Sequence, residues 1–259
     1  MSDHFEAGTT TVTGAGDEQI EAYAATPLAE RRHGGVVVIH HMPGFDEASK
    51  EITRRFGAWG YASLCPNLHH RNAPGAAPDD AAAAARSAGG VPDERMLGDV
   101  AGAVAQLRAL PTSNGQVAVI GFCSGGRQAM LAAAALDIDA VVDCYGAFVL
   151  NPPPSEHGLS MTSLRDRVGE INCPVLGLFG AEDRFPSPEE VAELDRLLSA
   201  AGNEPQFHTF ADAGHAFFAV DRPSYRVAAA VEGWALVREF LRTHLGDPTS
   251  AAAWAQGRS

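Results

Sequence analysis

Apolar residues along this chain form two kinds of run, and the two kinds alternate. Short β-branched or aliphatic runs, such as residues 36–39 and 175–179, predict strands buried on both faces of a sheet. Between such runs lie stretches like 94–110, where apolar residues recur at helical spacing. This alternation predicts an α/β fold with a mixed, mostly parallel sheet of about eight strands, flanked by helices on both faces.

The first strands differ from the later ones. Residues 5–25 contain two stretches in which polar positions alternate with apolar ones, separated by a turn at 14–16, and they predict two strands at a sheet edge. A helix is then expected after residue 45. Asp46 can cap its N-terminus, and Gly60 can end it.

Two further stretches, residues 72–92 and 246–259, bear on the organisation of the chain. Residues 72–92 are rich in Ala, Gly and Pro, and they predict a long loop with one helical turn at the run of alanines. Neither an internal repeat nor a linker long enough to separate domains is present. We therefore expect one domain over residues 1–245 and a loose tail over 246–259.

Composition and charge narrow the class of protein. The chain has 259 residues with 46% hydrophobic and 20% charged side chains, which is typical of a globular domain. Its formal charge of −13 argues against nucleic acid as a partner, because that binding requires a basic surface. The sequence contains neither a membrane-spanning apolar run nor a signal-peptide pattern at its first residues, so we expect a cytoplasmic protein, monomeric or a small homo-oligomer.

The strongest chemical signal is the segment GFCSGG at residues 121–126, which follows an apolar strand and opens an alanine-rich helix. This is the context of a nucleophile elbow, with Cys123 in the place that serine usually takes. A sulfur at the N-terminus of a helix is favoured as thiolate, and the backbone N–H of Ser124 can stabilise an oxyanion. The alternatives are a small buried cysteine at a glycine-rich turn, or Ser124 itself, which lies outside the motif's register.

A cysteine nucleophile needs a base, and the base needs an orienting acid. Asp183 follows the expected strand 175–179 and is our candidate acid, with Glu182 as the alternative. His215 follows the expected strand 206–210 and is our candidate base, next to the flexible Gly214. Three other downstream histidines fit less well because they lie in a proline-rich loop, within a strand and near the last helix end: His157, His208 and His244.

Two histidine pairs, His40-His41 and His69-His70, each end an expected core strand. Neighbouring residues of a strand point to opposite faces, so each pair offers one inward side chain, and we expect these residues to line a pocket and to bind no metal. The substrate pocket is expected to include four residues: His41, Arg71, Tyr145 and Phe217. Arg71 is a candidate anchor for an anionic substrate, whereas Tyr145 could equally pack in the core.

The chain resembles the dienelactone hydrolase family, the carboxymethylenebutenolidase-like branch of the α/β-hydrolases. The matching stretches are VIHHMPGFDEASKEITRRFGAWGYASLCPNL, GFCSGGR, PVLGLFGAEDRFPSPEE and FADAGHAFFAVDRPSYR. The resemblance implies a triad of Cys123, His215 and Asp183 that cleaves a small ester or lactone through an acyl-enzyme. It also implies that no metal or organic cofactor takes part, and that the backbone N–H of Met42 is the second oxyanion donor.

Two positions depart from the family pattern. His41 stands where the family enzyme has a glutamate that helps activate the thiol, and Ala219 stands where it has an arginine for the substrate carboxylate. The alternatives are therefore a thioesterase or general carboxylesterase of the same fold, or a non-catalytic binding or stress protein that retains the fold.

Overall fold

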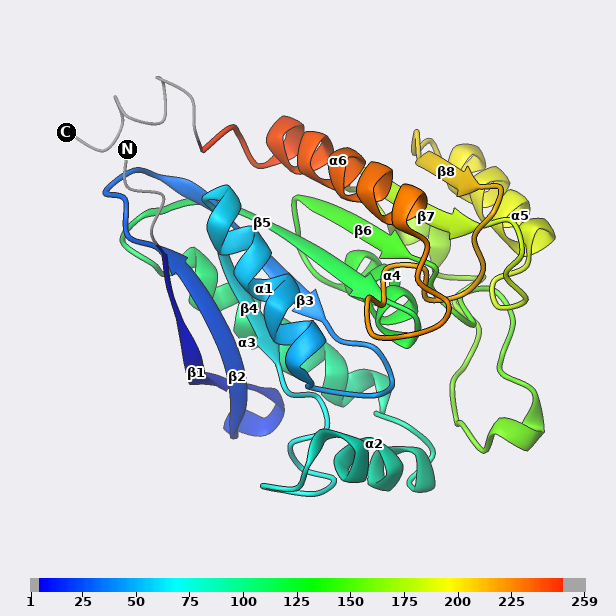
Figure 1. Ribbon diagram of the computed structural model, residues 1–259, viewed down its shortest axis with the longest axis horizontal. Helices are drawn as coiled ribbons and strands as arrows, with labels where there is room; N and C mark the ends of the chain where they lie inside the picture. Colours follow the sequence, from blue (N-terminus) through cyan, green and yellow to red (C-terminus); the bar gives the residue numbers. More distant parts are fainter. Residues whose placement is uncertain (1–4, 249–259) are drawn as a thin grey trace.

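The computed structural model describes residues 5–248, and Figure 1 shows their arrangement. All eight strands described there belong to one sheet, in the order β1-β2-β4-β3-β5-β6-β7-β8. The strands are β1 (Phe5–Thr13), β2 (Gln19–Pro27), β3 (His33–Ile39), β4 (Ala62–Pro66), β5 (Ser113–Phe122), β6 (Ala140–Cys144), β7 (Val175–Gly180) and β8 (Gln206–Phe210). Strand β2 pairs antiparallel with β1 and β4, whereas the other pairs are parallel, which confirms the expected mixed sheet.

Helices cover both faces of this sheet (Figure 1). They are α1 (Glu47–Trp59), α2 (Pro78–Ser87), α3 (Asp93–Arg108), α4 (Ser124–Ala135), α5 (Pro188–Ala200) and α6 (Val227–His244), with short 3₁₀ turns η1 (Ala15–Asp17), η2 (Ser155–His157) and η3 (Val168–Glu170). Val36 and Val38 pack in the cluster that α1 and α6 cover, and Val37 packs in the cluster under α3, α4 and α5. Strands sandwiched in this way need apolar residues at successive positions, which explains the continuous apolar runs.

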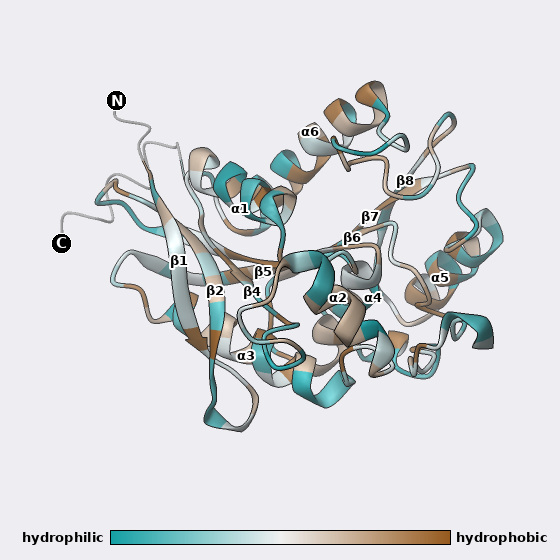
Figure 2. Cartoon of the chain, turned by 60° about the horizontal axis from the view of Figure 1, so that its bottom comes forward, coloured by the Kyte–Doolittle hydropathy of each residue, from teal (hydrophilic) through white to brown (hydrophobic). Residues whose placement is uncertain are grey.

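Hydropathy follows the same layers. In Figure 2 the central strands are mostly brown, whereas outer surfaces such as that of α1 carry hydrophilic colours. The edge strand β1 is largely exposed, as its polar alternation predicts. In the part of the chain that the structure describes, no helix is both long and apolar enough to cross a membrane.

Helix ends agree with the sequence where capping chemistry is clear. The Asp46 side chain accepts a hydrogen bond from the N–H of Ser49 at the start of α1, and Gly60 ends this helix with a left-handed φ of 94°. One expectation was wrong: residues 72–92 contain the whole helix α2 and not a single turn. Pro78 at its first position, acidic residues in its first turn and the helix propensity of its alanines account for the difference. Residues 249–259 of the expected tail lie outside the described residues.

The strand order positions the functional residues. The chain runs from β3 to β4 on one side and then crosses to β5 on the other, so β3 and β5 are neighbours in the sheet. Ligand sites of open α/β sheets lie at the carboxyl ends of the strands, where the strand order reverses. The segments that follow β3, β5, β6, β7 and β8 therefore meet at one edge of the sheet.

Candidate active site

Cys123 stands at the tip of the turn between β5 and α4. Its φ of 56° and ψ of −122° are strained values for a residue with a side chain. Three backbone hydrogen bonds hold this conformation. The N–H of Cys123 donates to the carbonyl of Cys144, and its carbonyl accepts from the N–H groups of Gly126 and Ala147. The sulfur is thereby presented in a fixed position at the first turn of α4.

The two glycines that flank the motif are required by close packing. A Cβ at Gly121 would overlap the carbonyl of Gly125, and a Cβ at Gly125 would overlap the carbonyl of Ile39. The turn can therefore close only without side chains at these two positions. This physical requirement is the one that the sequence pattern around Cys123 predicts.

His215 and Asp183 come together at the same edge. His215 lies in the loop after β8, and its Nδ1 is 2.8 Å from Oδ2 of Asp183. Asp183 follows β7 and is buried, and its Oδ1 accepts a hydrogen bond of 2.9 Å from the N–H of Phe185. Glu182, the alternative acid, is exposed. The hydrogen bond that Nδ1–H of His215 donates to Asp183 fixes the ring and leaves Nε2 as the nitrogen available for the site.

The electrostatics of His215 favour its charged form. Burial by itself lowers the pKa of this imidazole, but hydrogen bonds to Asp183 and Cys123, together with the negative charges of these partners, raise the pKa to about 10. His215 is therefore protonated at neutral pH. An imidazolium beside a sulfur stabilises the thiolate, which is the nucleophilic form of cysteine.

One cavity of about 490 Å³ brings these groups together. Cys123, Ser124, Met42, Asp183 and His215 line one part of it. The remaining wall is largely apolar and is formed by Ala147, Phe148, His157, Leu159, Glu182, Arg184 and Phe185. A volume of this size is typical of small-molecule sites, which occupy about 300 to 1,000 Å³.

Two residues that were expected in the substrate pocket lie elsewhere. Arg71 forms hydrogen bonds of 2.9 and 3.1 Å to both carboxylate oxygens of the buried Asp99, and it also pairs with Glu18 on the hairpin side of the sheet. Phe217 is fully buried, with its ring 5.2 Å from that of Tyr145. The expectation was wrong for both, because Arg71 neutralises a buried carboxylate and Phe217 packs in the core.

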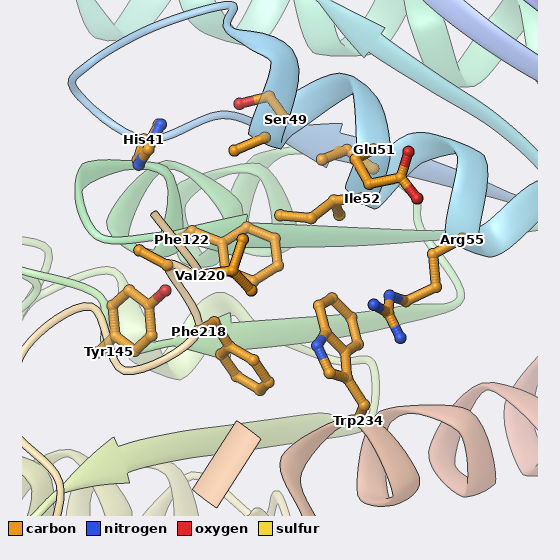
Figure 3. Close-up of a pocket in the computed structure, with 13 residues that line it drawn as sticks. His41, Ser49, Glu51, Ile52, Arg55, Phe122, Tyr145, Phe218, Val220 and Trp234 are labelled. Atoms are coloured by element: carbon orange, nitrogen blue, oxygen red, sulfur yellow. The ribbon is translucent and has the colours of Figure 1, made fainter. Parts of the chain in front are cut away.

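The other two expected pocket residues, His41 and Tyr145, line a second cavity of about 80 Å³ (Figure 3). This cavity lies between α1 and the loop before α6, and its other end is bounded by Arg55 and Trp234. His41 Nε2 is 2.7 Å from Oδ2 of Asp46, the cap of α1. The Tyr145 ring is 5.3 Å from that of His215, the candidate base, so Tyr145 also contacts this histidine.

Of the two histidine pairs, His40 and His69 contact each other, whereas Nδ1 of His70 accepts a hydrogen bond from the N–H of Glu21. The rings of His40 and His69 lie 4.8 Å apart, and Nε2 of His40 accepts a hydrogen bond from the N–H of Leu68. Burial lowers the pKa of His40 to about 3 and that of His69 to about 4, so both are neutral. Among residues 5–248 there is no group of three or more His, Cys, Asp or Glu side chains arranged to hold a metal ion.

Most residues of the apolar wall of the Cys123 cavity are not predicted by the sequence patterns. Phe148 and Phe185 both line the cavity of Cys123, and each lies within a few residues of the end of a core strand, β6 or β7. Their position directly after parallel strands is the signal that could have identified them, because those strand ends face the site. His157 and Leu159 come from the proline-rich loop, which carries no such signal.

Comparisons with known proteins identify the family to which the chain belongs. Residues 20–245 match the model of a family described as the dienelactone hydrolase family. A Salmonella typhimurium protein assigned as a carboxymethylenebutenolidase is 30% identical over 93% of this chain and 89% of its own length. The carboxymethylenebutenolidase of Pseudomonas putida is 29% identical over 75% of this chain and 79% of its own. A solved structure from Klebsiella pneumoniae, assigned as a dienelactone hydrolase, superposes with a TM-score of 0.79 at 28% identity, covering 90% of this chain and 97% of that one.

Proposed function

The chain belongs to the dienelactone hydrolase family and is a lactone or ester hydrolase, and from this premise we propose that Cys123, His215 and Asp183 form its catalytic triad. One observation carries the proposal. The strained turn presents Cys123 to the same cavity as His215, whose Nδ1 is held 2.8 Å from the buried Asp183. Nucleophile, base and orienting acid thus stand in the order that a triad requires.

The first half of the reaction forms an acyl-enzyme. The thiolate of Cys123 attacks the carbonyl carbon, a C–S bond forms, and the carbonyl electron pair moves to oxygen. The backbone N–H groups of Ser124 and Met42, which both line the cavity, donate hydrogen bonds to this oxyanion. When the intermediate collapses, the C–O bond breaks and the imidazolium of His215 gives its proton to the departing alkoxide. The product is a thioester and an alcohol, which in a lactone stays attached.

The second half regenerates the enzyme. Neutral His215 removes a proton from water while the water oxygen attacks the thioester carbonyl. The same two N–H groups hold the second oxyanion. Collapse of this intermediate breaks the C–S bond and releases the carboxylic acid, leaving thiolate and imidazolium as at the start. Asp183 stabilises the imidazolium and fixes its ring throughout, without becoming protonated.

Removal of the sulfur tests the proposal directly. We expect Cys123→Ala to lose at least about 10³-fold in kcat/KM on simple alkyl esters, because no other nucleophile is activated. Cys173→Ala is the matched control, because this second thiol is buried before β7 and remote from the cavity. Hydrolysis is followed by acid release, and the acyl-enzyme by the mass increase of the intact protein. Survival of activity in Cys123→Ala would disprove the mechanism.

Alkylation provides a test that needs no substrate. Because His215 remains protonated up to about pH 10, iodoacetamide should label Cys123 rapidly between pH 6 and pH 8. The other three cysteines are buried and should react slowly. His215→Ala should remove the rapid phase. If Cys123 reacts only above about pH 8.5, the ordinary pKa of a free thiol, and does so equally in the wild type and in His215→Ala, the protein is not catalytic.

A further inference from the structure

Three rings form a contiguous surface in the cavity of Cys123. The ring of Phe148 lies 5.3 Å from that of Phe185 and 5.8 Å from that of His157, and the last two are 5.9 Å apart. All three line the cavity, together with Leu159 and Met42. Ring centroids at these separations are in the range in which aromatic groups attract one another. A further ring entering the cavity could therefore contact the same surface.

Phe148 adopts a backbone conformation that a bulky residue normally avoids. Its φ is 68°, in the left-handed region, and the residue is nevertheless buried, with 8% of its surface exposed. Backbone strain of this kind persists only where surrounding contacts enforce it, and it concentrates at functional sites. Here the next residues are tied down, since the N–H of Leu150 donates to Oε1 of Glu190 and the carbonyl of Val149 accepts from Leu164.

The loop that completes the wall is fixed to the rest of the molecule. The N–H of Ser160 donates to the carbonyl of Gly89, at 2.8 Å. Arg127 of α4 is buried, donates to the carbonyl of Thr162 at 2.8 Å, and pairs with Asp93 of α3. His157 and Leu159 are therefore carried by a segment that is bonded to Gly89, in the connection before α3, and to Arg127 of α4. Contacts within the protein thus fix this wall.

Apart from Asp183 and His215, the charged residues that line this cavity, Glu182 and Arg184, are exposed and lie at its rim. Among the described residues that line it, the one guanidinium is Arg184, which is exposed and lies two positions from the exposed Glu182. Arg71, the expected anchor for an anion, is occupied by Asp99. A carboxylate placed between Phe148 and Phe185 would therefore lose its hydration without gaining a cationic partner, which is unfavourable.

We propose that the substrates of this enzyme are neutral esters or lactones that carry an aromatic ring, packed against Phe148 and Phe185, and that substrates with a second, free carboxylate in the same place are rejected. The inference rests on the proposed function, because it assigns the substrate class of the same site. Ring packing accounts for the choice of an aromatic group. The rejection of anions follows because the guanidinium of Arg184 lies at the exposed rim, so a carboxylate beside Phe148 and Phe185 has no cationic partner there.

Two pairs of alkyl esters test for a ring, one on each side of the scissile bond. Ethyl 4-phenylbutanoate is compared with ethyl butanoate, and benzyl acetate with butyl acetate, with acid release followed by a pH indicator. In at least one pair we expect the ring-bearing ester to have a kcat/KM about tenfold higher. Monoethyl glutarate, compared with ethyl pentanoate, tests the carboxylate and should be about a hundredfold slower.

Variants locate the effect. Phe185→Ala should bring the ring preference to within about twofold, and Phe185→Leu, which keeps apolar bulk, should retain part of it. The matched control is Phe207→Ala, which removes another half-buried ring, on β8, whose centroid lies 5.0 Å from that of Phe179. This control should leave the preference as it is in the wild type.

The outcomes are decisive in both directions. Equal rates within both ester pairs, or an equal loss in Phe185→Ala for ring-bearing and ring-free esters, overturn the inference. Faster hydrolysis of monoethyl glutarate that disappears in Arg184→Gln also overturns it, since the rim cation would then select anions. If Cys123→Ala is inactive and the ring preference is absent, the substrate class alone is wrong. If Cys123→Ala is active, the proposed function fails first.

Discussion

The carboxyl edge of the sheet has two halves. Both carry several titratable side chains in the sequence, but in the structure only one half contributes such side chains to the cavity of Cys123. The half that follows β5, β7 and β8 carries Cys123, Asp183 and His215, and all three line one cavity of about 490 Å³. The half that follows β3 and β4 carries five basic side chains: His40, His41, His69, His70 and Arg71. None of these five lines the cavity of Cys123.

The difference lies in what each polar group is bonded to. In the second half, Arg71 is paired with Asp99, His41 with Asp46, and His40 packs on His69. The bonds of Arg71 and His41 satisfy their polar groups within the protein and leave little for a ligand, whereas Nδ1 of the buried His69 has no hydrogen-bond partner among the described residues. In the first half, Asp183 is bonded to His215, but His215 and Cys123 both line a cavity. Polar side chains can act on a substrate only where some of their hydrogen-bonding groups line a cavity that the substrate can enter.

The largest effect on kcat/KM is expected from replacing Asp183, the proposed acid in the first half. Asp183→Asn should lower kcat/KM by about 10³- to 10⁴-fold, because an amide orients the wrong tautomer of His215. The control is Glu182→Gln, which changes the exposed neighbouring acid and should remain close to the wild type. Steady-state hydrolysis of one good ester measures both. A larger loss in Glu182→Gln would transfer the role of the acid to that residue.

Substitutions in the second half should lower the free energy of unfolding and leave kcat/KM nearly unchanged. Arg71→Met leaves Asp99 buried without its partner and should lower the free energy of unfolding by about 3 to 5 kcal/mol, measured by urea denaturation. The double variant Arg71→Met with Asp99→Asn should recover part of this loss. The kcat/KM of the folded protein should stay within about twofold of the wild type. A change in substrate preference at unchanged stability would place Arg71 in the functional half.

The smallest effect is expected at the boundary between the halves. His41 precedes the proposed oxyanion donor Met42, but its ring is bonded to Asp46. Burial raises the pKa of Asp46, but hydrogen bonds from His41 and Ser49 outweigh this and hold it below its usual range. His41→Gln should therefore lower kcat/KM by at most about fivefold and leave the alkylation rate of Cys123 unchanged. Slower alkylation, comparable with that of His215→Ala, would show that His41 activates the thiol.

Much of the fold could be read from local patterns. Residues 206–210 form a strand with the expected bounds, and the cap at Asp46 and the stop at Gly60 are confirmed. These features depend on periodicity and on the chemistry of one or two side chains, which the sequence displays directly. Helix α2 was underestimated, because a run of alanines between glycines and prolines does not reveal how far the helix extends.

The sequence by itself determined the α/β sheet, the family and the three residues of the proposed triad, because strand periodicity and the glycines of the Cys123 turn are local requirements. Only the tertiary structure decided which side chains form the cavity. Arg71 and Phe148 illustrate the reason: one is drawn away by a carboxylate 28 residues further along the chain, and the other is turned toward the site by a strained backbone. Contacts between distant segments fix such orientations, and they leave no local pattern.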